Sequence, residues 1–311
     1  MGCSVALFVS SICKCAPRMA VTTPNLDDLF HDPAEIARIR AEAAFGLREI
    51  GPEVDRLPEG ARLLEIGCGT GYLLAQLSSR RPDIALTGLE PIGKGFAKFE
   101  TTLTSIESAF SNLKIHRLPI ERFSPAEAEA GFDLIISVNV FEHLDDWREA
   151  TDRALALLKP GGRMIVLCPN YSVPYESHFG IPIVFSPAVT RRLFDRRIRQ
   201  VEKQADADGL WLSLNFITAP ALQRHCRGRQ IALEFDRDVM ARMLERLDTD
   251  PEFAARQATV AGIARLLRRL GLGRLLSWLP PAFSPYMKAV LHRDQSWNSP
   301  RARAAGTGMS A

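Results

Sequence analysis

The stretch that decides the fold is "LLEIGCGTGYLL", which runs from Leu63 to Leu74. An apolar run ends in a glycine-rich turn, and a second apolar run follows directly. Three glycines, Gly67, Gly69 and Gly71, alternate with small residues. Because glycine has no Cβ, it accepts positive φ angles and lets another molecule approach the backbone closely. The stretch therefore predicts a strand, a tight turn and a helix, with the turn next to a ligand.

The overall composition is that of a globular protein. The chain has 311 residues, 46% hydrophobic and 24% charged, and it is long enough for one large α/β domain or two small ones. Its net charge of +3 is too small to indicate nucleic-acid binding on its own. Six scattered cysteines form no disulfide pattern, and the Cys13–Cys15 pair lacks a second Cys or His pair to complete a metal site. We therefore expect reduced thiols, a cytoplasmic location and no bound metal.

The two ends of the chain differ in composition from its middle. No stretch is apolar over the length needed to span a bilayer. The N-terminal stretch "MGCSVALFVSSICKCAPRMA" lacks the basic region that precedes the apolar segment of a secretory signal. We expect residues 1–24 to form a disordered leader and residues 294–311 a disordered tail. Residues 25–293 are expected to form a single domain.

Strand and helix patterns alternate from about residue 33 to residue 168. Strand-like runs cover 61–67, 84–90, 113–120, 132–140 and 163–170. Helical periodicity covers 33–50, 71–82, 95–110 and 147–162, where Pro160, Gly161 and Gly162 mark the helix end. A further helix–strand step over 219–236 and a last strand over 286–293 follow. These patterns predict a Rossmann-like, doubly wound α/β fold with seven mostly parallel strands and helices on both faces.

The predicted fold places the ligand and divides the domain. In such sheets ligands bind at the carboxyl ends of the strands, beside the first one. Residues 60–170 are therefore expected to form the cofactor-binding core. The less regular segments over 171–217 and 239–280 are expected to form a helical cap over the substrate.

Two glutamates lie near the glycine turn. Glu65 belongs to the last part of the first strand, where a buried carboxylate is costly unless it meets a cation or hydrogen-bond donors. Glu90 ends the second strand, where an acidic side chain can accept hydrogen bonds from both hydroxyls of a ribose. Because its charge would repel a 2′-phosphate, an NADP-type ligand is disfavoured.

The turn distinguishes two classes of cofactor. A dinucleotide site has the spacing GxGxxG, and its third glycine would stand where this chain has Tyr72. A pyrophosphate is an anion, and Glu65 would oppose it at the helix N-terminus. The ammonium group of S-adenosylmethionine would instead be attracted by Glu65. The charges therefore favour the sulfonium cofactor.

Four segments, in this order and spacing, resemble class I S-adenosylmethionine-dependent methyltransferases of the small-molecule type related to ubiquinone-biosynthesis enzymes. They are "LLEIGCGTG" (63–71), "TGLEP" (87–91), "FDLIISVNVFEHLDD" (132–146) and "LLKPGGRMIVLCPN" (157–170). The resemblance covers about residues 60–170. It implies S-adenosylmethionine as the cofactor and methyl transfer to a small molecule.

The same resemblance implies which residues bind the cofactor. Glu65 would lie close to the ammonium group, Glu90 would hold the ribose hydroxyls, and Asn139 would contact the methionyl group. The other implied contacts come from the turn and the strand ends, namely Gly67, Cys68, Gly69, Gly71, Pro91 and Ile120. Many relatives contact adenine through an acidic residue after the third strand, where this chain has Pro119 in "RLPIE". Two adenine contacts stay open, the backbone around Ile120 or Glu121.

The chemistry needs few catalytic groups. A sulfonium methyl is already activated, so its transfer depends on alignment and on exclusion of water. A general base is needed only where the acceptor must lose a proton early. The candidates are His143 in "FEHL" and Tyr175 and His178 in "NYSVPYESH", which also contains Tyr171 and Glu176. His143 could instead order its loop, and the other two could serve packing alone.

The acceptor is less well defined by the sequence. Enzymes that methylate base amines in nucleic acids carry a polar-Pro-Pro-aromatic signature after the fourth strand, whereas this chain has "SVNVFEH". We therefore expect a small-molecule substrate and no nucleic-acid partner. The basic stretches "RRLFDRRIRQVEK" (191–203) and "IARLLRRLGLGRLLSWLPPAF" (263–283) predict either solvated helix faces or contact with a lipid-like or phosphate-bearing acceptor and a membrane surface.

Two other functions fit parts of this pattern. A nicotinamide-dependent oxidoreductase would use a similar fold, although the glycine spacing and Glu65 disfavour it. A non-catalytic cofactor-binding protein would keep the cofactor pocket and lack the acceptor site.

Overall fold

The computed structural model describes residues 33–92, 99–124, 131–205, 207–256 and 278–293, together with the single residues 26, 126, 262, 266 and 271. The expected leader over 1–24, the expected tail over 294–311 and most of the basic stretch over 263–283 lie outside these described residues.

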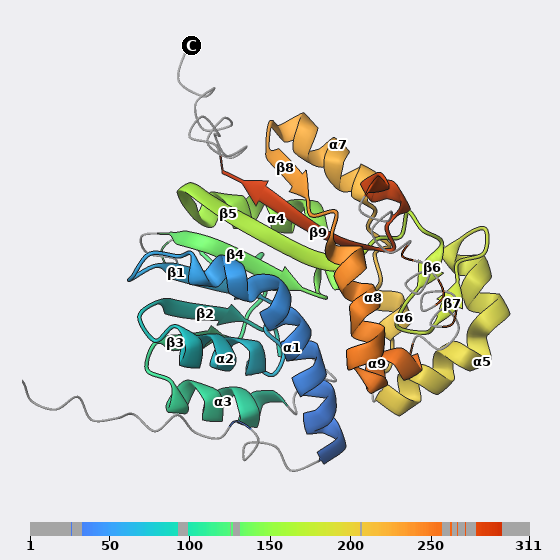
Figure 1. Cartoon of the computed structure of the whole chain (residues 1–311), viewed down its shortest axis with the longest axis horizontal. Coiled ribbons are helices and arrows are strands. Elements are labelled where there is room, and N and C mark those ends of the chain that lie inside the picture. Colours follow the sequence, from blue (N-terminus) through green and yellow to red (C-terminus); the bar gives the residue numbers. More distant parts are fainter. Residues whose placement is uncertain are drawn as a thin grey trace, which may run out of the picture.

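A seven-stranded sheet forms the centre of the molecule (Figure 1). Across the sheet the strands are β3 (Leu113–His116), β2 (Ala85–Leu89), β1 (Arg62–Ile66), β4 (Phe132–Val138), β5 (Leu158–Pro169), β9 (Tyr286–His292) and β8 (Ala232–Phe235). The first five of these strands pair in parallel, and β9 runs antiparallel to both of its neighbours. The predicted α/β fold with seven mostly parallel strands is confirmed.

Helices cover both faces of the sheet. One face is packed by α1 (Pro33–Asp55), α2 (Tyr72–Arg80), α3 (Phe99–Ala109) and α8 (Val239–Thr249), and the other by α4 (Trp147–Leu157) and α7 (Ala219–Arg229). Strand β1 contributes side chains to the apolar cores on both faces of the sheet, because successive side chains of a strand point to opposite faces. Leu63 belongs to the first core, and Leu64 and Ile66 belong to the second. By the same alternation Glu65 lies on the face of Leu63.

The segment between α4 and β5 differs from the prediction. The helix ends at Leu157, and β5 already begins at Leu158, which pairs with Phe132 of β4. A Cβ on Gly162 would lie 2.9 Å from the Phe132 carbonyl oxygen, so only glycine allows the two strands to approach so closely. Pairing with β4 therefore draws the Pro-Gly-Gly segment, predicted as the helix end, into the strand.

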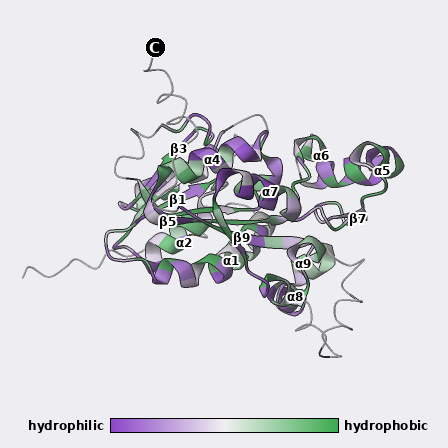
Figure 2. Cartoon of the chain, turned by 90° about the horizontal axis from the view of Figure 1, so that it is seen from above, coloured by the Kyte–Doolittle hydropathy of each residue, from purple (hydrophilic) through white to green (hydrophobic). Residues whose placement is uncertain are grey.

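Residues 171–217 form a small lobe that follows the carboxyl end of β5 (Figures 1 and 2). It contains β6 (Tyr175–Glu176), β7 (Ile181–Pro182), α5 (Pro187–Ala205) and α6 (Leu210–Ser213). The lobe has an apolar core of its own, formed by Tyr171, Phe179, Ile181, Ile198, Trp211 and Leu214. In the described part of the chain, no helix has the length and apolar character needed to cross a bilayer.

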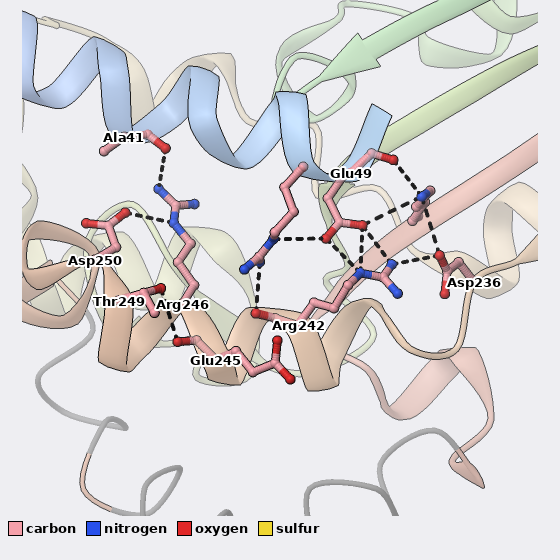
Figure 3. A network of polar contacts seen from close by, with 10 residues as sticks. Ala41, Glu49, Asp236, Arg242, Glu245, Arg246, Thr249 and Asp250 are labelled. Carbon is pink, nitrogen blue, oxygen red and sulfur yellow. Dashed lines mark hydrogen bonds and ion pairs between the residues drawn. The ribbon is translucent and has the colours of Figure 1, made fainter. Parts of the chain in front are cut away.

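A network of charged side chains holds α8 against α1 (Figure 3). Arg242 of α8 donates hydrogen bonds at 2.7–3.0 Å to the carboxylate of Glu49 in α1 and one at 2.7 Å to Asp236. Lys288 of β9 lies 3.6 Å from the Glu49 carboxylate and 3.4 Å from Asp236. One turn further along α8, Arg246 donates to Asp250 before α9 (Pro251–Arg256). The network therefore ties together three segments that lie far apart in the sequence.

Candidate active site

The glycine turn after β1 is held against the end of β2. The backbone N–H groups of Gly67 and Cys68 both donate to the Leu89 carbonyl oxygen, at 2.8 and 3.0 Å. Gly71, at φ 75°, then precedes the first residue of α2. The turn is thus a rigid connection between strand and helix at the carboxyl edge of the sheet.

The three glycines of the turn have different tasks. All have positive φ, which disfavours any residue with a Cβ. A Cβ on Gly67 would lie 2.5 Å from the Val140 side chain, and one on Gly71 would lie 3.1 Å from Leu103, so both glycines are required for packing. At Gly69 no described atom lies within 4 Å of the Cβ position. Only Gly69 therefore faces open space that a ligand could enter.

Glu65 is buried beside this turn without complete pairing. It is 3% exposed, and its Oε2 has no hydrogen-bond partner among the described residues. Burial, with a smaller contribution from the charge of Glu90, raises the pKa of Glu65 to about 8. An orphaned buried carboxylate oxygen fits a ligand that brings an ammonium group, because a cation would restore the lost pairing.

Glu90, directly after β2, contacts the same turn. It accepts a hydrogen bond of 2.7 Å from the Gly69 N–H. Burial raises the pKa of Glu90 to about 7, although this hydrogen bond acts in the opposite direction. The two glutamates and the open glycine form what we call the cradle (Glu65, Gly69 and Glu90), in which a ligand meets carboxylates rather than cations.

Asn139 follows β4 in a strained conformation. Its φ is +55°, and its N–H donates to the Leu167 carbonyl oxygen at 2.8 Å. Its Oδ1 accepts a hydrogen bond of 2.6 Å from the hydroxyl of Tyr286 in β9. Sequence reasoning missed Tyr286, because its position beside Asn139 depends on the pairing of β9 with β5.

The remaining predicted cofactor residues contribute in other ways. The Cys68 sulfur packs against Gly88, where an added Cβ would lie only 2.8 Å from it. Ile120 is fully buried in the core with Phe123, whereas Pro91 is exposed after the end of β2. Cys68 and Ile120 thus direct their side chains into the protein, which leaves their backbone atoms for any contact with a ligand.

The structure brings the two predicted histidines together. His143 belongs to the short helix η2 (Phe141–His143) after β4, and His178 belongs to the lobe. Their rings lie 5.3 Å apart, edge to face. Between them is Glu142, whose Oε1 lies 4.0 Å from the His143 Nε2 and 3.9 Å from the His178 Nε2. We call Glu142, His143 and His178 the histidine cluster.

Glu176 supports the histidine cluster from behind. It accepts hydrogen bonds from the His178 Nδ1 at 2.6 Å, from the Tyr171 hydroxyl at 3.0 Å and from the Phe179 N–H at 2.8 Å. Burial alone would raise its pKa, but His178 and these donors hold the pKa of Glu176 below its ordinary value. Glu176 is therefore an ionised partner of His178. Tyr175 precedes it on β6, where burial raises the Tyr175 pKa.

Burial also governs the other members of the cluster. It raises the pKa of Glu142 to about 7, against the attraction of His178. It lowers the pKa of His143 to about 4, and the nearby His178 acts in the same direction. Sequence reasoning missed Glu142, although its place directly after the fourth strand, between Phe141 and His143, was a usable signal.

Comparison with known proteins agrees with this arrangement. A family model described as "Methyltransferase domain" matches residues 34–233. An uncharacterised protein of Mycobacterium tuberculosis is 39% identical over 255 residues, covering 81% of this chain and 85% of that protein. The ubiquinone biosynthesis O-methyltransferase of Brucella ovis is 28% identical over 172 residues, covering 55% of this chain and 64% of that protein.

Among solved structures, phosphoethanolamine N-methyltransferase 2 of Haemonchus contortus, in complex with S-adenosyl-L-methionine, has a TM-score of 0.49. Its sequence is 14% identical, and the match covers 88% of this chain and 61% of that one. The family model spans well over half of the present sequence and includes the cradle and the histidine cluster. The chain therefore belongs to the methyltransferase domain family.

Proposed function

We propose that the protein transfers the methyl group of S-adenosylmethionine to a hydroxyl oxygen of a lipid-like or phosphate-bearing small molecule. The observation that carries the cofactor placement is the cradle. Glu65 and Glu90 are both buried, Glu90 is hydrogen-bonded to Gly69, and Gly69 is open to a ligand. This charge pattern suits an ammonium and two ribose hydroxyls and opposes a pyrophosphate.

Within this proposal each residue of the cradle has a defined task. Glu65 pairs with the ammonium group of the cofactor, and the backbone at Gly69 lies along its methionyl part. Glu90 accepts hydrogen bonds from the ribose hydroxyls. Asn139, held by Tyr286, contacts the methionyl group from the end of β4. Gly67 and Gly71 keep the shape of the turn on which these contacts depend.

The transfer step is an in-line displacement. The acceptor oxygen forms a bond to the methyl carbon while the carbon–sulfur bond breaks, and the electron pair of that bond stays on sulfur. The product cofactor, S-adenosylhomocysteine, is then a neutral thioether, and the proton of the acceptor hydroxyl leaves to solvent. The histidine cluster supports an acceptor that must give up a proton. The name of the Brucella relative, an O-methyltransferase, also favours oxygen.

The surface of the lobe supports an amphiphilic acceptor. Four large apolar side chains are exposed there, Phe185 at 97%, Val189 at 38%, Leu193 at 63% and Leu212 at 67%. Exposed arginines lie among them on α5, at Arg191, Arg192, Arg196 and Arg199. Apolar side chains next to arginines fit a molecule that combines an acyl chain with an anionic head, and they also suit peripheral contact with an anionic membrane.

A thermal-shift experiment with S-adenosylhomocysteine tests the cofactor site. The ligand should raise the melting temperature of the wild-type protein, because it binds the native state only. Gly69→Val should abolish that shift, because the side chain fills the open space. Gly161→Val is the matched control, since Gly161 also has positive φ and open space at its Cβ but lies at the start of β5. An equal shift in both variants would show that the cofactor binds elsewhere.

Transfer of a radiolabelled methyl group tests the acceptor. The enzyme is incubated with labelled S-adenosylmethionine and with separate organic and aqueous extracts of bacterial cells. We expect label in an anionic component of the organic extract, recovered as a base-stable methyl ether. Label that appears only in neutral water-soluble compounds would exclude an amphiphilic acceptor, and a methyl amine or a base-labile methyl ester would exclude an ether-forming hydroxyl.

A further inference from the structure

The proposed methyl transfer does not explain why the Glu142 carboxylate is buried without hydrogen-bond partners. Its side chain is 0% exposed, and neither carboxylate oxygen has a hydrogen-bond partner among the described residues. A buried carboxylate without partners is unfavourable by several kcal/mol unless it is neutralised or paired. A buried, unpaired carboxylate beside a proposed reaction centre is best explained by a ligand that pairs with it.

Two imidazoles are directed at this carboxylate. The Nε2 atoms of His143 and His178 lie 4.0 and 3.9 Å from the Glu142 Oε1. One ligand atom from each of the three residues lies within 4.8 Å of the other two. Bonds of about 2.0–2.2 Å from a cation to nitrogen and oxygen can bridge such separations after a small inward movement of the side chains.

The second nitrogen of each imidazole is already engaged. The Ser213 hydroxyl donates to the Leu210 carbonyl oxygen at 2.8 Å, so it accepts from the His143 Nδ1–H, also at 2.8 Å. The His178 Nδ1–H donates to the ionised Glu176 at 2.6 Å. The neutral form of either ring therefore carries its lone pair on Nε2, toward Glu142. Histidines that bind metals are usually held in this way by a carboxylate or another acceptor.

We propose that Glu142, His143 and His178 bind a divalent transition-metal cation. Two imidazole nitrogens and one carboxylate suit Zn²⁺, Co²⁺, Mn²⁺ or Fe²⁺, whereas Mg²⁺ and Ca²⁺ prefer oxygen ligands. Three protein ligands leave at least one coordination position open. The site is assigned from the geometry of these residues and differs from the expectation, based on the cysteine pattern, that no metal is bound.

The site lies next to the proposed point of methyl transfer. Glu142 lies three residues after Asn139 in the segment that follows β4. The Asn139 side chain accepts a hydrogen bond of 2.6 Å from the Tyr286 hydroxyl. The role of the cation rests on the proposed function. An acceptor hydroxyl bound at the open coordination position of the cation would have a lower pKa and so lose its proton to solvent more readily. Its oxygen would then attack the methyl carbon.

Metal binding can be measured without any acceptor. The full chain is treated with chelator and desalted, then titrated with Zn²⁺ by calorimetry and with Co²⁺ by visible absorption. We expect one cation per chain, with the Co²⁺ bands typical of nitrogen and oxygen ligands. Glu142→Gln should abolish binding at this site. Asp145→Asn, which removes an exposed acidic group three residues further along the same loop, should bind as the wild type does.

Glu176→Gln gives a second measure that does not alter a ligand. Loss of the partner of His178 should weaken Zn²⁺ binding by about 10–100-fold. The melting temperature of each variant, with and without S-adenosylhomocysteine, shows whether the protein is folded and whether it still binds the cofactor.

The outcomes separate the two proposals. Binding of one Zn²⁺ that Glu142→Gln abolishes and Asp145→Asn preserves supports the metal site. Wild-type protein that binds S-adenosylhomocysteine and no cation overturns the metal site and leaves the proposed function standing. Cation binding that survives in Glu142→Gln also overturns it. Protein that binds the cation at Glu142 without binding S-adenosylhomocysteine would instead contradict the cofactor cradle.

Discussion

Glu49 in α1 and Glu142 in η2 have side chains that are both 0% exposed, yet their surroundings are opposite. Glu49 accepts hydrogen bonds from Arg242 and has Arg48 and Lys288 within 3.7 and 3.6 Å (Figure 3). Glu142 has no hydrogen-bond partner among the described residues and faces two imidazoles at 3.9 and 4.0 Å.

The difference shows how burial can serve either stability or function. A buried carboxylate that is fully paired joins elements together, and removal of one partner leaves an unpaired charge. A buried carboxylate that lacks partners keeps its proton more tightly, as the pKa of about 7 for Glu142 shows. We infer that Glu49 is a structural residue and that Glu142 is reserved for a ligand.

The largest expected effect is on stability at Glu49. Glu49→Gln should lower the free energy of unfolding by about 3–5 kcal/mol, because Arg242 and Lys288 keep their buried charges without the carboxylate. Glu142→Gln should not lower it at pH 7, because no hydrogen bond is lost and a neutral amide avoids the cost of a buried carboxylate charge. Urea unfolding followed by circular dichroism measures both. Equal destabilisation by the two substitutions would remove the distinction between these glutamates.

A third buried glutamate tests whether partial pairing also indicates a binding role. Glu90 accepts a hydrogen bond from the Gly69 N–H and lies in the cradle. Glu90→Ala should weaken binding of S-adenosylhomocysteine by about 1–3 kcal/mol, the range for hydrogen bonds to a charged group. Calorimetric titration measures the change. Glu49→Asp is the control, because it changes a buried glutamate outside the cradle and should leave the affinity unchanged. Unchanged affinity in Glu90→Ala would mean that the ribose is placed wrongly.

The pH dependence of stability sharpens the comparison further. The pKa of Glu142 is about 7 in the folded protein and near 4.5 in the unfolded chain, so the folded protein binds more protons between these values. Its contribution to the free energy of unfolding therefore falls as pH rises through this window. From pH 5 to pH 7, in chelator, the wild type should lose about 2 kcal/mol more than Glu142→Gln.

The contributions of Glu65 and Glu90 are common to both proteins and cancel, so the difference reports Glu142 together with its coupling to His178. Urea unfolding at the two pH values provides the measurement. Parallel pH profiles for the wild type and Glu142→Gln would show that Glu142 does not hold its proton in the folded protein.

The smallest expected effect concerns the strand that connects the two regions. Lys288 and Tyr286 lie on β9, and they reach Glu49 and Asn139 respectively. Tyr286→Phe should raise the activation free energy of methyl transfer by about 0.5–1.5 kcal/mol, because Asn139 loses one hydrogen bond. The rate should therefore fall by about 2- to 10-fold. Single-turnover transfer at saturating cofactor measures this loss. A large fall in stability without a change in rate would assign Tyr286 to packing instead.

Much of the fold was predictable because its signals are local. Strand β1 and the turn after it follow from one apolar run and three glycines, and the observed positive φ angles explain why glycine is needed there. The end of α4 was predicted wrongly. Pro-Gly-Gly indicates that a helix stops, but pairing of Leu158 with Phe132 decides where the next strand begins.

The cradle and the histidine cluster differ in how far the sequence could predict them. Glu65 lies near the end of β1 and Glu90 directly after β2, so their placement at the same edge of the sheet follows from the parallel pairing of these two strands. The contact between Glu142 and His178 depends on how the lobe folds back after β5, and no periodicity in the sequence describes that. Ser213, which fixes the tautomer of His143, comes from α6, a helix of four residues that has no distinct signal.

The sequence by itself determined the alternation of strands and helices, the glycine turn and the charge of the cradle, because each depends on residues within one strand–turn–helix unit. Tertiary structure alone decided that Arg242 and Lys288 pair with Glu49 across 193 and 239 residues, and that Glu142 meets imidazoles instead of cations. The physical reason is that burial acts on a side chain through whatever the fold packs against it. The chemistry of a buried glutamate is therefore set by its neighbours in space.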